Sequence, residues 1–186
     1  MPKIYTKNGD SGNTNLFLGG SLSKSDLRVE TYGTVDEAVS CLGFAKTQIN
    51  TNEIKEIIEH IQHSLFKVGA ELSTQVSKSS KINDLINTIN ESSIKELEKF
   101  IDEATNEVNI GTEFIMPGIS SGSASLDVAR TVVRRLERLI VNLNEKFPLK
   151  NHNIMIYINR MSDLLFVLGR LEDKNRDTKK IRGIRK

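Results

Sequence analysis

The sequence predicts an all-α protein, a five-helix up-and-down bundle with an irregular N-terminal segment. Two observations predict this fold. Five stretches carry apolar residues at alternating intervals of three and four, the spacing of one buried helix face. No stretch shows a convincing alternation of apolar and polar residues, as a half-buried strand would. The 186 residues fit a single domain over residues 1–186, and amphipathic helices of this kind pack as a bundle.

The irregular segment is predicted to cover residues 1–33. Residues 7–15 are dense in Gly, Asn, Asp and Ser, which favour turns, and a Gly-Gly pair further on adds a second break. Thr34 and Glu37 have the spacing of a capping box. The first helix is therefore expected to begin at about Val35.

The five predicted helices follow from the apolar positions. They cover approximately residues 35–49, 54–72, 94–108, 126–143 and 154–168. The polar residues 73–90 are expected to form a loop with some local helix. A Pro-Gly pair precedes the fourth helix, and Pro148 ends it. Residues 174–186 are basic and lack apolar periodicity, so they are expected to form a mobile tail.

Composition and charge narrow the class of protein. Apolar residues make up 38% and charged residues 27% of the chain, and the formal net charge is +2. This balance gives no whole-molecule field that would attract nucleic acid, and no apolar run is long enough to cross a membrane. The single cysteine, Cys41, excludes an internal disulfide framework and suits a reducing compartment. We therefore expect a cytoplasmic protein that binds neither nucleic acid nor a membrane.

The fourth helix, residues 125–144, is rich in arginine. Its arginines are Arg130, Arg134, Arg135 and Arg138. Like-charged pairs at i,i+4 destabilise an isolated helix by a few tenths of a kcal/mol each, so compensating negative charge is expected. One source is a bound polyphosphate, which the planar donors of arginine can bind bidentately. The other is ion pairing with Glu137 and with acidic groups of other helices. Periodicity leaves both interpretations open.

The fifth helix places four side chains on one face: Asn159, Asp163, Phe166 and Arg170. Asp163 is expected to pair with an arginine of the fourth helix, and Asn159 can contact a sugar or a base edge. The alternative is that these polar groups only satisfy one another inside the bundle.

The N-terminal segment offers glycines, hydroxyls and lysines. Glycines let backbone N–H groups approach an anion closely, and the side chains add donors. The segment is not a Walker loop, because the chain contains no Gly-Lys dipeptide. By composition alone, an ordinary exposed turn explains it equally well.

Taken together, these segments resemble the PduO-type ATP:cob(I)alamin adenosyltransferases. The resemblance rests on residues 4–14 (IYTKNGDSGNT), 33–37 (GTVDE), 114–118 (FIMPG), 128–138 (VARTVVRRLER) and 157–166 (YINRMSDLLF). These motifs occur in the family's order and span nearly the whole chain. The resemblance implies a homotrimer with active sites between subunits. It also implies that cobalt(I) of a reduced corrinoid attacks the 5′ carbon of ATP, giving adenosylcobalamin and triphosphate.

The resemblance also implies site residues by their positions in the motifs. ATP would be bound by Thr6, Lys7, Asn8, Gly9, Thr14, Asn15, Lys24, Arg134, Arg135, Glu137, Arg138 and Asn159. The corrinoid would be bound by Phe114, Phe166 and Asp163, with the aromatic rings helping to exclude its lower axial ligand. The catalytic group would comprise Arg130, Arg134, Asp36 and Glu137, in which Arg130 pairs with Asp36 of the partner subunit. Mg²⁺ would be held mainly by the ATP phosphates and not by protein ligands.

Two other functions stay open from the sequence. One is a helical ATP-binding regulatory or chaperone subunit that has lost catalysis but keeps the ATP loop. The other is a structural bundle whose arginines only form ion pairs. A corrinoid reductase is a further expected partner of an adenosyltransferase. The family's C-terminal segment can contribute an aromatic residue to the corrinoid pocket, but no Phe, Tyr or Trp follows Phe166 in this chain.

Overall fold

The computed structural model describes residues 5, 7, 9–111, 113–176 and 180–185. Its long helices are α1 (Leu27–Gln48), α2 (Asn52–Leu72), α4 (Glu91–Asn106), α5 (Ser121–Lys146) and α6 (Asn153–Glu172). The connection between α2 and α4 contains the short helices η1 (Val76–Lys78) and α3 (Ser79–Ile82). The predicted all-α bundle is confirmed, including the local helix in the polar stretch.

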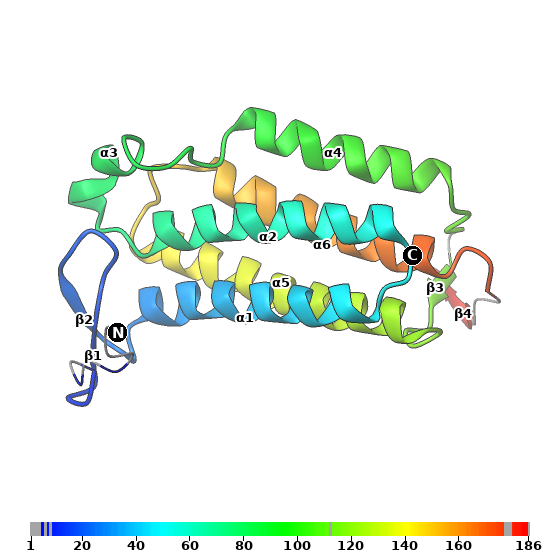
Figure 1. The fold of residues 1–186 in the computed structure, drawn as a ribbon, viewed down its shortest axis with the longest axis horizontal. Coiled ribbons are helices and arrows are strands. Elements are labelled where there is room, and N and C mark those ends of the chain that lie inside the picture. Colours follow the sequence, from blue (N-terminus) through cyan, green and yellow to red (C-terminus); the bar gives the residue numbers. More distant parts are fainter. Residues whose placement is uncertain (1–4, 6, 8, 112, 177–179, 186) are drawn as a thin grey trace.

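Successive long helices run in alternating directions (Figure 1). Helix α1 packs against α2 and α5, and α6 packs against α5 and α4. The predicted apolar seams meet in the centre, where Leu42, Leu65, Leu136 and Leu165 are fully buried. No helix in the described part of the chain is long and apolar enough to cross a membrane.

Helix α1 begins at Leu27, so the prediction of a start near Val35 was wrong. Asp26 is the N-cap, and its carboxylate accepts a hydrogen bond of 2.8 Å from the backbone N–H of Arg28. Thr34 does not cap the helix, because its hydroxyl donates to the carbonyl of Glu30 one turn earlier, at 2.9 Å.

Four short strands were not expected. In the N-terminal segment, β1 (Asn13–Asn15) and β2 (Ser21–Ser23) form an antiparallel hairpin. Strand β3 (Glu113–Ile115) precedes α5 and pairs antiparallel with β4 (Lys180–Arg185). The basic C-terminal segment thus contains a strand, where the sequence predicted none. Three of the strands have only three residues, which is too short to show a period of two. The six residues of β4 show no alternation either, because Ile181 and Ile184 are three positions apart.

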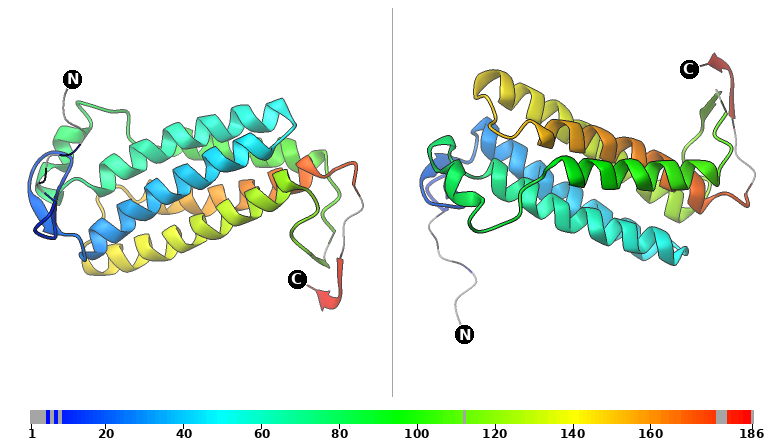
Figure 2. Two further views of the ribbon diagram at one scale, coloured as in Figure 1. Left: turned by 60° about the horizontal axis from the view of Figure 1, so that its bottom comes forward. Right: turned by 90° about the horizontal axis from the view of Figure 1, so that it is seen from above.

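The two strand pairs lie at opposite ends of the bundle (Figure 2). The hairpin β1–β2 leads into the first turn of α1, whereas β3 leads towards the first turn of α5, which runs antiparallel to α1. The 26 residues of α5 span about 40 Å at ~1.5 Å per residue. Residues on the hairpin and residues on β3 are therefore separated by the length of the bundle.

A carboxylate from the end of α6 caps the start of α2. Thr51, the N-cap of α2, makes no capping bond with its own side chain. Instead, the Glu172 carboxylate accepts hydrogen bonds from the backbone N–H groups of Asn50 at 2.8 Å and Thr51 at 3.4 Å. This contact ties together two helices that are far apart in the sequence.

We expect Glu172→Ala to lower the free energy of unfolding by about 1 kcal/mol, the usual loss when a helix N-terminus loses its cap. Urea denaturation followed by circular dichroism measures this. Glu145→Ala is the control, because the Glu145 side chain is exposed and makes no hydrogen bond or ion pair within the described residues. Equal stabilities of the two variants would contradict the capping role.

Candidate active site

Three arginines of α5 have partners inside the chain: Arg130, which pairs with Asp127, and Arg135 and Arg138. Arg135 forms an ion pair with Glu37 of α1, and both side chains are about half exposed. The Arg138 guanidinium donates to the backbone carbonyl of Arg134 at 3.0 Å. Part of the arginine cluster is therefore compensated within the bundle, which supports the ion-pair interpretation for Arg135.

Arg134 differs from its neighbours. Its side chain is exposed, and its guanidinium makes no hydrogen bond or ion pair within the described part of the chain. Arg130 and Arg138 lie one turn away on either side and repel its positive charge. No acidic side chain forms an ion pair with Arg134 within the described part of the chain. This arginine is available for an anionic ligand.

Glu137 and Asn159, two residues predicted to bind ATP, lie in contact with each other. The Asn159 amide nitrogen donates to Glu137 Oε1 at 2.9 Å, across the contact between α5 and α6. The Asn159 amide oxygen accepts from Arg160 Nη1 at 3.0 Å, and Arg160 Nε donates to Glu98 of α4 at 3.0 Å. A continuous polar chain thus crosses three helices beside the arginine flank and fixes the orientation of the Asn159 amide.

The sequence missed a buried ion cluster near the start of α5. Arg170 and Asp127 are only 4% and 7% exposed, and Arg170 Nη2 donates to Asp127 Oδ2 at 2.6 Å. Arg130 Nε lies 3.5 Å from the other oxygen of the same carboxylate. The guanidinium of Arg170 also lies 5.2 Å from the ring centre of Phe166, a cation–π contact. The cluster thus links Arg130 to Phe166.

Asp163 does not pair with an arginine of α5, so that prediction was wrong. Its side chain is exposed, and no ion pair joins it to another described residue. In the ion pair that does join α5 and α6, the acid is on α5 (Asp127) and the cation is on α6 (Arg170), the reverse of what was predicted. The i,i+3 spacing of Asp127 and Arg130 was the only sequence signal for this cluster.

The N-terminal hairpin is held by Lys24. Its ammonium group donates to the carbonyl of Gly9 at 2.8 Å, and its backbone N–H donates to the carbonyl of Gly12 at 2.8 Å. Gly12 has a φ of 82°, which favours glycine. Lys7 is exposed, while Thr14 and Asn15 belong to β1. Thr6 and Asn8 lie outside the described residues.

The remaining predicted residues lie on other surfaces. Phe114 is part of β3 and is 43% exposed, next to Met116 at 48%. Asp36 is exposed on α1 and forms no ion pair with another described residue, and Arg130 has Asp127 as its partner within the chain. Among the described side chains, no three His, Cys, Asp or Glu residues form a group that could hold a metal ion.

The fold and these contacts define a class: a helical bundle with a basic, partly uncompensated flank, a hairpin held by Lys24 at one end and the exposed Phe114 at the other. The family is then clear from comparison with known proteins. The chain belongs to the cobalamin adenosyltransferase family, whose model matches residues 4–172.

Individual relatives support this assignment to the family. A corrinoid adenosyltransferase from Citrobacter freundii is 40% identical over 177 residues, which cover 95% of this chain and 98% of that protein. The corrinoid adenosyltransferase PduO of the same organism is 38% identical over 91% of this chain, which spans half of that longer protein. A variant PduO-type ATP:corrinoid adenosyltransferase from Lactobacillus reuteri, complexed with cobalamin and ATP, superimposes with a TM-score of 0.88. It is 35% identical, and the match covers 97% of this chain and 100% of that one.

Proposed function

We propose that this chain transfers the 5′-deoxyadenosyl group of ATP to cobalt(I) of a reduced corrinoid, giving adenosylcobalamin and triphosphate. The match of residues 4–172 to the cobalamin adenosyltransferase family carries this proposal. The corrinoid adenosyltransferases among its relatives, and the similar structure that holds cobalamin and ATP, agree with it. The protein is thus an enzyme of the transferase class, with ATP and a corrinoid as its substrates.

The chemistry explains why arginine dominates the candidate site. A cobalt–carbon bond forms while the bond from C5′ to the triphosphate oxygen breaks, and triphosphate leaves with the electron pair. Negative charge therefore builds on the leaving group, where preorganised cationic donors stabilise it. Cobalt(I) supplies the nucleophilic electron pair, so the step needs no general base. The protein contributes orientation and electrostatics.

We assign the triphosphate side of the site to α5 and α6. Arg134 is its centre, because its guanidinium has no partner within the described chain. Arg135 and Arg138 add positive charge, and the hydrogen-bonded pair of Glu137 and Asn159 orients groups for the nucleoside. The N-terminal segment would enclose the phosphates through the following residues: Thr6, Lys7, Asn8, Gly9, Thr14, Asn15 and Lys24.

We assign the corrinoid side to Phe114, Phe166 and Asp163. Phe114 is exposed at one end of the bundle, while the N-terminal hairpin lies at the other, about 40 Å away along α5. The 5′ carbon and the cobalt must approach to about 3 Å before they react. This separation supports a site that combines the hairpin of one subunit with the corrinoid surface of another, in a homotrimer.

Magnesium enters this proposal as part of the ATP substrate. Mg²⁺ would be bound mainly by the phosphate oxygens of ATP, which are the ligands that it prefers. The single cysteine suits a reducing cytoplasm. We propose a corrinoid reductase as a partner, since the substrate must carry cobalt(I).

The direct test is turnover. The protein is mixed with ATP, Mg²⁺ and chemically reduced cobalamin, and formation of the cobalt–carbon bond is followed by its absorbance spectrum. Formation of adenosylcobalamin is the expected result. ATP binding without product would favour a regulatory ATP-binding subunit. Absence of ATP binding would favour a structural bundle.

We expect Asp36→Asn to weaken trimer assembly by about tenfold or more, since it removes one charge of the proposed pair with Arg130 of the partner subunit. Helix content should not change, because Asp36 is exposed and unpaired within the described chain. Sedimentation velocity and activity measure the effect. Asp102→Asn, an exposed position on α4, is the control. Unchanged sedimentation and activity would refute the inter-subunit pair.

A further inference from the structure

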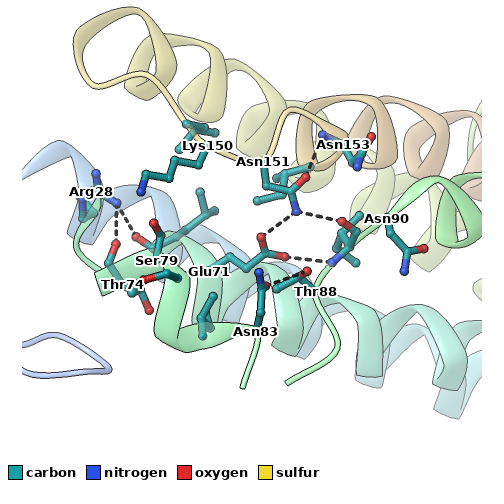
Figure 3. A pocket seen from close by; sticks show the side chains of 16 residues that line it. Arg28, Glu71, Thr74, Ser79, Asn83, Thr88, Asn90, Lys150, Asn151 and Asn153 are labelled. Atoms are coloured by element: carbon teal, nitrogen blue, oxygen red, sulfur yellow. Dashed lines mark hydrogen bonds between the residues drawn. The ribbon is translucent and has the colours of Figure 1, made fainter. Parts of the chain in front are cut away.

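A cavity of about 450 Å³ lies at the hairpin end of the bundle, between the end of α2, the α2–α4 connection and the α5–α6 connection (Figure 3). Its polar wall includes Arg28, Glu71, Ser79, Lys150 and Asn151. No residue assigned above to ATP or corrinoid lines it. Cavities of this size commonly hold small organic ligands.

Glu71 is the one acidic residue in the described cavity wall, and both of its carboxylate oxygens already accept hydrogen bonds. Glu71 Oε1 accepts from the backbone N–H of Ile89 at 3.0 Å, and Oε2 accepts from the Asn151 amide at 2.7 Å. Burial raises the pKa of Glu71, while the hydrogen bonds from Asn151 and Ile89 act in the opposite direction. Asn151 is fixed in turn, because its amide also donates to the carbonyl of Ile89 at 2.8 Å.

Neither cation of the wall, Arg28 or Lys150, forms an ion pair within the described part of the chain. Arg28 is 8% exposed, and Nη1 donates to the carbonyls of Leu72 at 2.9 Å and Thr74 at 3.3 Å. Both acceptors are neutral, and the other guanidinium nitrogens make no hydrogen bond within the described chain. Burial lowers the pKa of Arg28, and only Asp26 opposes this effect. A guanidinium with spare donors thus faces the cavity.

Lys150 adds a second positive charge. It lies in the α5–α6 connection, and its side chain is exposed without an ion pair to any described residue. In Figure 3, the Lys150 amine and the Arg28 guanidinium lie on the same side of the cavity, away from the hydrogen bonds between Glu71 and Asn151. The hydroxyl-bearing Thr74 and Ser79 line this side as well.

We propose that this cavity is a second ligand site, which binds a small metabolite through an oxyanion group, either a phosphate or a carboxylate, held by Arg28 and Lys150. The oxyanion occupies the cationic side, where arginine offers paired donors and lysine a point charge. The apolar wall, which includes Leu72, Ile82 and Leu149, holds the carbon skeleton.

Isothermal titration calorimetry of the full chain tests this proposal with two probes, inorganic phosphate and succinate. At least one probe is expected to bind the wild type, and the better of the two identifies the oxyanion. Lys150→Glu should weaken that binding by about tenfold or more, since it places a like charge beside the anion. Lys150 is exposed, so the variant is expected to fold.

Two controls separate this site from the proposed ATP site. Lys146→Glu changes an exposed lysine outside the cavity and should leave probe binding within about twofold of the wild type. Arg134→Ala should also leave it unchanged, whatever its effect on ATP. The proposal is overturned if neither probe binds, if Lys150→Glu binds as the wild type does, or if Arg134→Ala abolishes the binding.

Discussion

Arg134→Ala is expected to lower kcat/KM for ATP by about 100-fold to 1,000-fold, the usual cost of removing one preorganised donor to a developing negative charge. The protein should remain as stable as the wild type or become slightly more stable. Arg134 is exposed and has no partner within the described chain, while Arg130 and Arg138 are like-charged neighbours one turn away. Removing it relieves a repulsion of a few tenths of a kcal/mol per pair.

Steady-state kinetics and thermal denaturation of the same preparation measure both effects. Lys146→Ala removes a positive charge from the last turn of the same helix and serves as the control for net charge. Arg134→Lys keeps the charge but loses the planar pair of donors, so an intermediate activity is expected. A parallel loss of activity and stability in Arg134→Ala would show that the residue supports the fold and not the ligand.

Asp127→Ala is expected to lower the free energy of unfolding by about 3–5 kcal/mol, since it leaves a buried guanidinium without its counter-ion. Arg170 is 4% exposed, and its hydrogen bond to Asp127 is 2.6 Å long. Arg130 Nε is buried without a hydrogen bond, and it lies 3.5 Å from the Asp127 carboxylate. Removing Asp127 therefore also takes away the negative charge beside Arg130. Urea denaturation with the m-value held common to all variants gives the change.

The double variant Asp127→Leu with Arg170→Met separates the cost of a lone charge from the value of the pair. Apolar residues of similar volume often replace a buried ion pair at little cost. We therefore expect the double variant to recover most of the stability lost in Asp127→Ala. A loss below about 1 kcal/mol in Asp127→Ala would contradict the buried pair, because such a small effect is typical of exposed salt bridges.

The sequence predicted the helices whose buried faces are apolar. It misplaced the start of α1, whose first turns bury polar side chains. Periodicity located α2, α4, α5 and α6, whose inner faces are aliphatic. The first turns of α1 instead bury Arg28 and Thr31. Arg28 reaches the carbonyls at the end of α2, and Thr31 donates to the carbonyl of Leu27 at 2.7 Å. A pattern of apolar residues cannot reveal a buried face whose polar groups are satisfied by the backbone.

The sequence likewise predicted only part of the candidate site. Motifs identified Glu137 and Asn159, which hydrogen-bond to each other in the structure. The pair of Asp127 and Arg170 depends on the register in which α5 crosses α6, and spacing within one helix does not define that register. Asp163 illustrates the same limit, because it lies on α6 but is exposed and has no ionic partner among the described residues.

The β3–β4 ribbon at one end of the bundle can open separately from the helices. The two strands come from distant parts of the chain and form an isolated two-stranded ribbon, which gains little stability by itself. Opening the ribbon breaks few contacts, whereas opening the bundle exposes the whole aliphatic core. Phe114 lies on this ribbon, so its surroundings can change when the two strands separate, while every long helix stays folded.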